Sequence, residues 1–449
     1  MRNYCIIVVL FWLFCLPIQS AQAQISNALT VEESVKMGLE HSYRLQAAEA
    51  DAEEAEAVFR GTRSSRFPSI RGQASYMRLS DNIPEVDFSL PGTDTTYTIL
   101  PVELDQFHTE LGIEQLLFAG GRLNNQIEAA SHQASAAELA KEQQRVDVAY
   151  QVRQAYWNLY RAQVADEVLE SALKRVDEHL QNVRNKMEAG TVLQTDLLNA
   201  KTRRSEVLLD RVDSESRVQV ARLELNRLLG LPAEAEIELI KPGDSGARSF
   251  AVDKLTRRAL QQRPELQALS EQVGAREAQV NAVQSEWFPE ISLVGRYIYA
   301  RPNQYFFAQQ NEFRGTWEAG VQLRWNLWSG GQRFAETSRA RSQLQKAEAQ
   351  LADKREQVAI DISRQYLELQ RALKAIDVSE NSVAAAAEAY ESASRQFREG
   401  VILSEQVLDA EHAYRNAQAR HAEAIADYEI EYASVLHALG QIWGENDGN

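Results

Sequence analysis

Few residues of this chain have the types and the spacing that catalysis or metal binding requires. Its seven histidines include no HxxxH or HExxH pair, the spacings that place two metal ligands on one face of a helix. The chain also has no Walker loop, no GxGxxG turn and no serine-centred nucleophile elbow. Its only cysteines, Cys5 and Cys15, lie in the first fifteen residues. We therefore expect no enzyme activity, no cofactor and no metal site.

The N-terminus has the features of a secretory signal peptide. A single charge at Arg2 precedes an apolar stretch over 4–17 and an Ala-Gln-Ala motif that ends at Ala23. We predict that residues 1–23 are removed, which would leave a mature chain without cysteine. A lipid-modified N-terminus at Cys15 is the alternative, and the bulky aromatic residues in front of that cysteine disfavour it.

Charge and hydropathy limit the possible partners. The chain has 48 basic and 64 acidic residues, a net charge of −16, which argues against nucleic acid and favours cations over anions in any pore. Beyond the signal peptide, no stretch approaches the ~18 consecutive apolar residues of a membrane-spanning helix. Any membrane-spanning part must therefore be β-structure.

The chain contains one pattern twice. The motif LFAGG at 117–121 returns as LWSGG at 327–331, and EAGTVL at 188–193 returns as REGVIL at 398–403, each 210 positions later. Upstream the offset is 221, as between Phe67-Pro68 and Phe288-Pro289. The first copy thus has 11 extra residues between its two strands. We predict two structural repeats, 24–240 and 251–441, joined by a linker at 241–250 and followed by a tail at 442–449.

Each repeat is predicted to contain three helices. The first spans 30–66 or 252–287 and is stopped by Pro68 or Pro289, because proline disfavours helical geometry in the residue before it. The second is a long helix of ~100 Å, at 122–189 or 332–398. Turns at Gly190 and Gly400 lead into returning helices of ~36 residues that end at Gly230 and Gly440. The two shorter helices can therefore stack end to end beside the long one.

Between the first and second helices, the period of the apolar residues changes from 3.6 to 2. This alternation predicts strands at about 69–79, 107–118, 290–300 and 316–328. One face of the strands is apolar and ends in aromatic residues that we expect to face lipid or the membrane interface, with burial between subunits as the alternative: Phe107, Trp317, Trp325 and Trp328. Glycine pairs at Gly120-Gly121 and Gly330-Gly331 then mark the change from strand to long helix.

Strands with one apolar and one polar face suit a transmembrane barrel that encloses water. Four strands cannot close such a barrel, so several chains must share it: two would give eight strands, three twelve and four sixteen. We predict a mainly α-helical, internally duplicated fold with a membrane β-barrel part. Two alternatives are a secreted coiled-coil structural or adhesive protein, which would not need the alternating strands, and an uptake porin, which would devote most of its chain to strands.

The chain resembles the TolC-like outer-membrane efflux channels over essentially its whole mature length. The resemblance rests on the order and duplication of individually weak motifs: LTVEES at 29–34, FPSI at 67–70, FPEI at 288–291, the two Gly-Gly turns and the two tip motifs. It implies a homotrimer with a 12-stranded barrel in the outer membrane of a Gram-negative bacterium and an α-helical barrel in the periplasm. It further implies a passive, gated exit duct of a tripartite efflux or type I secretion system. Its partners would be a periplasmic adaptor protein and, indirectly, an inner-membrane transporter of the RND, ABC or MFS type.

The resemblance also implies where the channel narrows and where the adaptor docks. Family members often have two aspartates after the second tip glycine, at positions occupied here by Gln406 and Asp409. Glu405 could supply the missing charge, and Asp196 is the first-copy counterpart of Gln406; the alternative is that these are ordinary solvated helix residues. The family's aromatic and basic latch residues fall on Phe397 and Ile402, so that latch is not reproduced. The expected docking residues flank the two turns: Gly190, Thr191, Val192, Leu193, Gly400, Val401, Ile402 and Leu403.

Overall fold

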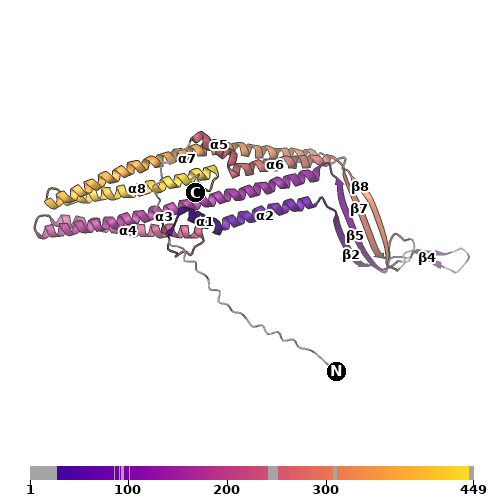
Figure 1. The fold of residues 1–449 in the computed structure, drawn as a ribbon. Helices are drawn as coiled ribbons and strands as arrows, with labels where there is room; N and C mark the ends of the chain where they lie inside the picture. The colour runs from indigo at the N-terminus through magenta and orange to yellow at the C-terminus, as the bar shows by residue number, and fades with distance from the viewer. Residues whose placement is uncertain are drawn as a thin grey trace, which may run out of the picture.

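The structure is a computed structural model, which describes residues 28–84, 86–89, 92, 96–100, 102–240, 251–306 and 311–443. The predicted signal peptide (1–23), the linker (241–250) and residues 444–449 of the tail lie outside the described residues. Long helices form one elongated body, and a sheet continues from one of its ends (Figure 1).

Two long helical hairpins make up most of the body. The first hairpin consists of α3 (Arg122–Glu188) and α4 (Gln194–Leu229), and the second of α7 (Gln332–Glu399) and α8 (Ser404–Leu439). These bounds lie within one residue of the predicted long helices, and the returning helices end at Gly230 and Gly440 as predicted. At 67 and 68 residues, α3 and α7 are each about 100 Å long.

Shorter helices cover the sheet-proximal halves of α3 and α7. They are α1 (Val31–His41), α2 (Tyr43–Ser64), α5 (Val252–Gln262), α6 (Pro264–Gln284) and the 3₁₀ turn η1 (Ser285–Trp287). The prediction of one unbroken helix in each place was wrong, because the chain is extended at Ser42 and at Arg263. Ser42 caps α2 by accepting a hydrogen bond from the Leu45 N–H at 3.3 Å. Arg263 precedes Pro264, which keeps it out of the helical region.

A four-stranded antiparallel sheet has the order β2-β5-β7-β8. Its strands are β2 (Ser69–Arg78), β5 (Asp105–Phe118), β7 (Glu290–Arg301) and β8 (Arg314–Arg324). The predicted strand 316–328 ends early, because β7 begins at Glu290, opposite Arg324. Residues 325–328 have no strand beside them in the described part of the chain.

Two small strand pairs were not predicted. β3 (Val86–Ser89) and β4 (Thr96–Leu100) form a hairpin within the extra segment of the first repeat, beyond the end of the sheet (Figure 1). β1 (Ala28–Leu29) and β6 (Glu238–Leu239) pair in parallel beside the helices. The second pair ties the start of the first repeat to its end.

The largest apolar cluster lies midway along α3. Trp157 is 4% exposed and contacts the rings of Tyr156 and Tyr160 edge-on, which confirms the interpretation of this tryptophan as core. The Tyr156 hydroxyl lies 3.0 Å from the carbonyl oxygens of Leu29 and Ile240. Burial raises the pKa of this hydroxyl, so it remains a hydrogen-bond donor. The cluster thereby fixes the β1-β6 pair against the helices.

The helices fall into central and edge positions. α3 packs against α1, α2, α4, α6 and α8, whereas α7 packs against α5, α6 and α8. α2 and α4 therefore form one edge of the chain and α7 the other, and the sheet likewise ends in β2 on one side and β8 on the other. None of the described helices combines the length and the apolar character that crossing a membrane would take.

Candidate functional site

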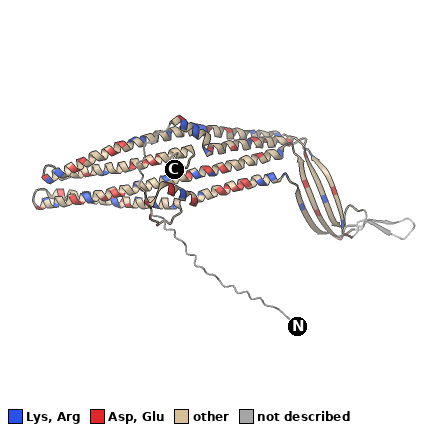
Figure 2. Ribbon diagram, viewed as in Figure 1, with Lys and Arg blue, Asp and Glu red and all other residues tan. Residues whose placement is uncertain are grey.

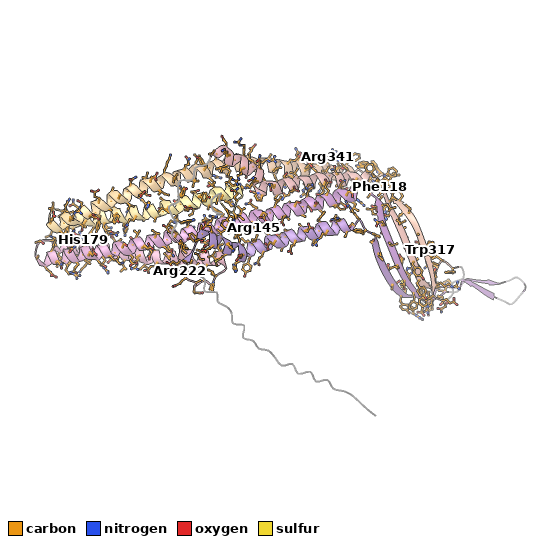
Figure 3. All side chains as sticks on the ribbon, in the orientation of Figure 1. Phe118, Arg145, His179, Arg222, Trp317 and Arg341 are labelled. Atoms are coloured by element: carbon orange, nitrogen blue, oxygen red, sulfur yellow. The ribbon has the colours of Figure 1, made fainter. Side chains whose placement is uncertain are left out.

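The end of the helical hairpins farthest from the sheet, which we call the tip, brings together most of the predicted site residues. Figure 3 places His179 at this end and Trp317 on the sheet, so that the two lie at opposite ends of the molecule. The turns Ala189–Leu193 and Gly400–Leu403 join the helices of each hairpin, with φ of 74° at Gly190 and 80° at Gly400. Both glycines hold the left-handed conformation that a side chain would disfavour.

The apolar residues of the two turns divide into exposed and half-buried ones. Leu193, Val401 and Leu403 are each at least 67% exposed. Val192 and Ile402 instead pack against the apolar cluster between the hairpins. The turns therefore present three large apolar side chains to solvent, fewer than the sequence suggested.

Two of the predicted pore residues act as helix caps. The Leu193 N–H donates a hydrogen bond to Asp196 Oδ2 at 3.0 Å, and the Leu403 N–H donates one to Gln406 Oε1 at 3.2 Å. Each side chain satisfies a backbone donor that the first turn of a helix leaves free. Asp196 and Gln406 thus have the same structural task in the two copies.

The other two predicted pore residues, Glu405 and Asp409, lie exposed on α8. The Asp409 carboxylate lies 4.0 Å from the guanidinium of Arg203 on α4, and the Asp409 side chain is 69% exposed. Because the contact is long and the Asp409 side chain is exposed to solvent, the carboxylate remains available to ions.

A buried ion pair between the hairpins was not predicted. Arg175 of α3 donates to Glu411 of α8 at 3.0 Å, and the Glu411 side chain is only 3% exposed. The Arg175 guanidinium also lies over the rings of Tyr414 and Tyr390, at 4.9 and 5.8 Å. Removing either partner of such a pair leaves an uncompensated buried charge, at a cost of about 3–5 kcal/mol.

One turn nearer the tip, a histidine joins the same two helices. His179 Nε2 lies 2.8 Å from the Ser404 hydroxyl, and its ring packs against Phe397. Burial lowers the pKa of His179 to about 4, so the imidazole is neutral at pH 7. The ring contact brings Phe397 of α7 into the same group of residues.

The sequence contains one signal for these contacts, which is a difference between the copies. The counterparts of Arg175 and His179, 210 positions later, are Ala385 and Ala389, and the counterpart of Glu411 is Lys201. Where a buried position is polar in one repeat and alanine in the other, the polar residue indicates a specific contact. Their partners are 236 and 225 residues away in sequence, so spacing alone could not pair them.

At the other end of the molecule, the sheet separates its side chains by face. Trp317, Trp325 and Trp328 are exposed, in keeping with an apolar outer surface. Phe107 is more covered, because it packs against Tyr76 at 4.7 Å and beneath the guanidinium of Arg301 at 4.5 Å.

The opposite face of the sheet is charged. Arg71 pairs with Glu114 at 3.3 Å and Arg296 with Glu318 at 3.0 Å, each across neighbouring strands. Figure 2 shows that acidic and basic residues recur along the strands of the sheet. One apolar and one charged face suit a wall between lipid and water.

The predicted transitions between strand and helix occur at the expected residues. Pro68 and Pro289 directly precede β2 and β7. Gly120, Gly121, Gly330 and Gly331 all have positive φ, and Gly121 and Gly331 cap the two long helices.

Comparison with known proteins agrees with this geometry. The model of the outer membrane efflux protein family matches residues 35–231 and 255–441. The alkaline protease secretion protein AprF of Pseudomonas aeruginosa is 22% identical over 75% of this chain and 70% of its own length. The toluene efflux pump outer membrane protein TtgC of Pseudomonas putida is 23% identical over 93% of this chain and 84% of its own length.

The solved structure of the outer membrane protein VceC from Vibrio cholerae has the same fold. It superimposes with a TM-score of 0.77 at 19% identity and covers 92% of this chain and 96% of its own. The family model spans both repeats and most of the chain. The chain therefore belongs to the outer membrane efflux protein family.

Proposed function

We propose that three copies of this chain form an exit duct from the periplasm to the outside, coupled to a periplasmic adaptor and an inner-membrane transporter. Family membership supplies the general role, an outer-membrane efflux channel. The observation that carries the finer proposal is a four-stranded sheet with two open edges that continues directly into helices of about 100 Å.

The open edges require further copies. β2 and β8 each have a strand partner on one side only in the described part of the chain. In lipid, each unpaired backbone N–H or C=O would cost several kcal/mol, so such a sheet must close on itself. Two copies would give an eight-stranded barrel filled by its own side chains, whereas three give twelve strands and a lumen. The resemblance to TolC-like channels also favours three.

The helical edges also expose apolar side chains that a neighbouring copy would cover. On α4 these are Leu198, Leu208, Leu209, Val212, Val220 and Leu223; on α7 they are Ile360, Leu367 and Val378. Both helices lie at an edge of the chain. Covering these stripes would add apolar burial to the closure of the sheet.

The exposed tip leucines and valine suit a docking surface for the adaptor. Leu193, Val401 and Leu403 protrude together from turns that are otherwise held by hydrogen bonds and by the cluster beneath them. The names of the relatives connect such proteins with protease secretion and with toluene efflux pumps. Both processes must deliver cargo to the channel from an inner-membrane machine, and the tip is the end farthest from the barrel.

The entrance is proposed to narrow at the acidic residues of α8. Threefold symmetry would turn Asp409, with Glu405 beside it, into a ring of carboxylates that attracts cations. Asp196 and Gln406 would lie next to this ring and hold the first turns of their helices.

Planar-bilayer recording of the purified protein tests the duct and its entrance. We expect a small, cation-preferring pore whose conductance rises and whose cation preference falls in Asp409→Ala. Asp213→Ala is a matched control, because Asp213 is an exposed carboxylate of α4 away from the tip. Unchanged conductance and selectivity in Asp409→Ala would remove Asp409 from the entrance.

A further inference from the structure

We propose that Arg301, at the outer end of the apolar face of the sheet, binds a phosphate of the phosphorylated glycolipid that forms the outer leaflet of the membrane. This inference rests on the proposed function, which places the apolar face against lipid. It also places the end of the sheet farthest from the helices at the cell exterior.

The charged residues of the apolar face lie at one end of it. The face consists of alternate residues, such as Ile70 to Arg78 in β2 and Ile291 to Arg301 in β7, with the residues opposite them in β5 and β8. Within the four described strands, its charged members are Arg78, Asp105 and Arg301. All three lie at the end of the sheet farthest from the helices, since β2 and β7 end there and β5 begins there.

The length of β7 places Arg301 at the level of the lipid headgroups. The strand has 12 residues. At the tilt of 35–45° usual in membrane barrels, they cover about 30 Å of height, slightly more than the apolar band of about 25 Å. Arg301 is the last residue of the strand, so its guanidinium lies just beyond the hydrocarbon, where phosphates are found.

Two aromatic rings hold the Arg301 guanidinium in place. Its central carbon lies 4.5 Å from the centre of the Phe107 ring and 5.1 Å from that of the Phe313 ring. Phe313 in turn stacks on Tyr299 at 5.3 Å. Both contacts of the guanidinium are favourable for a cation, and together they restrict the directions in which it can turn. The side chain is thereby oriented before any ligand binds, which lowers the entropy lost on binding.

Arg301 is also the cation of this group that lacks an anion. Arg78 pairs with Asp105 at 2.9 Å, and Asp105 accepts a further hydrogen bond from the Tyr76 hydroxyl at 2.8 Å. Within the described part of the chain, no carboxylate forms an ion pair with Arg301, and its Nε has no hydrogen-bond partner. Two arginines and one aspartate leave one positive charge, and it is located at Arg301.

A phosphorylated lipid complements both parts of this surface. The planar fork of a guanidinium matches two phosphate oxygens. On the hydrocarbon side of Arg301, the exposed rings of Tyr76, Tyr299 and Phe313 offer an apolar surface to acyl chains. A free phosphate would contact the cation alone, whereas the lipid would cover the cation and the rings together.

The opposite end of the face indicates which leaflet is bound. At the helical end, the apolar face of the strands finishes in Ile70, Ile291 and Leu323, which offer no charge to a phosphate. Only the outer end combines a cation with aromatic rings. The asymmetry therefore favours the lipid of the outer leaflet over that of the inner one.

Native mass spectrometry of the purified protein tests the site, with lipid A as the probe. Lipid A with both phosphates should bind more tightly than the same lipid A after its phosphates are removed. Arg301→Gln should weaken binding of the phosphorylated form about fivefold, the effect of one arginine near a lipid surface, and should bring it close to that of the dephosphorylated form. Arg296→Gln is the matched control, because Arg296 is an arginine of the same strand on the opposite face, and should bind as the unmodified protein does.

The outcomes separate this inference from the proposed channel. Equal binding of the two forms of lipid A by the unmodified protein would overturn the phosphate site, whether or not the variants fold. Equal loss in Arg301→Gln and Arg296→Gln would overturn the assignment to Arg301. Either result, in a protein that still conducts ions in a planar bilayer, would leave the channel standing. A protein that forms no channel would overturn both proposals.

Discussion

α3 and α7 are counterparts of almost equal length, yet α3 buries 21 residues and α7 only 8. The returning helices reverse the contrast, since α8 buries 18 residues and α4 only 8. The difference follows the position of each helix in the helical body, because α3 and α8 lie in its middle and α4 and α7 at its edges. One duplicated design thus provides both the core of a single chain and, in the proposed assembly, the surface that a neighbouring chain would cover.

The buried ion pair at the tip should produce the largest effect among changes to the central helices. We expect Arg175→Leu to cost about 3–5 kcal/mol of stability, because it leaves Glu411 charged and unpaired. Arg203→Leu, which removes the exposed contact to Asp409, should cost about 0–1 kcal/mol. Thermal unfolding in detergent, with hydrogen exchange at the tip, measures both. Equal losses would show that the pair is solvated, and Arg175→Leu with Glu411→Leu should recover most of the loss.

Core truncations sharpen the contrast between centre and edge. Leu159→Ala in α3 removes a fully buried side chain and should lower the free energy of unfolding by about 2–5 kcal/mol. Leu367→Ala in α7 removes a side chain that is 65% exposed in one copy. We expect the second change to weaken the association of copies, measured as resistance of the trimer to detergent dissociation, more than the fold of each. A Leu367→Ala trimer as resistant as the unmodified one would mean that no neighbour covers this residue.

His179 makes the tip sensitive to acid. Its pKa is about 4 in the folded chain and about 6.5 when unfolded, so the unfolded state binds the proton more readily. Stability should therefore fall as the pH decreases from about 6.5 to 4, by about 3 kcal/mol in total. The midpoint of thermal unfolding across this range measures the loss, and His179→Gln should remove most of the dependence. An identical pH profile in His179→Gln would assign the loss to other groups.

The stabilisation that the two helix caps at the tip provide should differ slightly between the two repeats of the chain. Asp196→Ala removes both a hydrogen bond and a negative charge at a helix N-terminus, whose charge term is worth about 0.3–1 kcal/mol. Gln406→Ala removes a hydrogen bond without a charge and should cost less. Hydrogen exchange at the amides of Leu193 and Leu403 compares the two, and a larger effect at Leu403 would contradict this ranking.

Much of the fold could be predicted from the sequence because its signals are local. Long glycine-free and proline-free stretches predicted α3 and α7, and glycines marked their ends. The break at Arg263 also has a local signal, because Pro264 follows it and disfavours helical geometry in the residue before it. The break at Ser42 depends on a capping serine that also occurs within helices, and the β3-β4 hairpin lies in a segment without clear alternation.

The tip was predicted less completely because its contacts are tertiary. The exposed Leu193, Val401 and Leu403 followed from their place in a turn, whereas the inward packing of Val192 and Ile402 depends on the cluster between the hairpins. The Arg175–Glu411 pair forms only because two helices from different repeats pack side by side and bring these two residues to the same height along their axes. Sequence spacing contains no information on that crossing.

The mass of the intact protein in mild detergent tests the central claim most directly. Native mass spectrometry of the protein extracted from outer membranes should give three copies of the chain. Among assemblies of two, three or four chains, three is the smallest number that encloses a lumen. A stable monomer would contradict the shared barrel, and a dimer would leave eight strands without a channel.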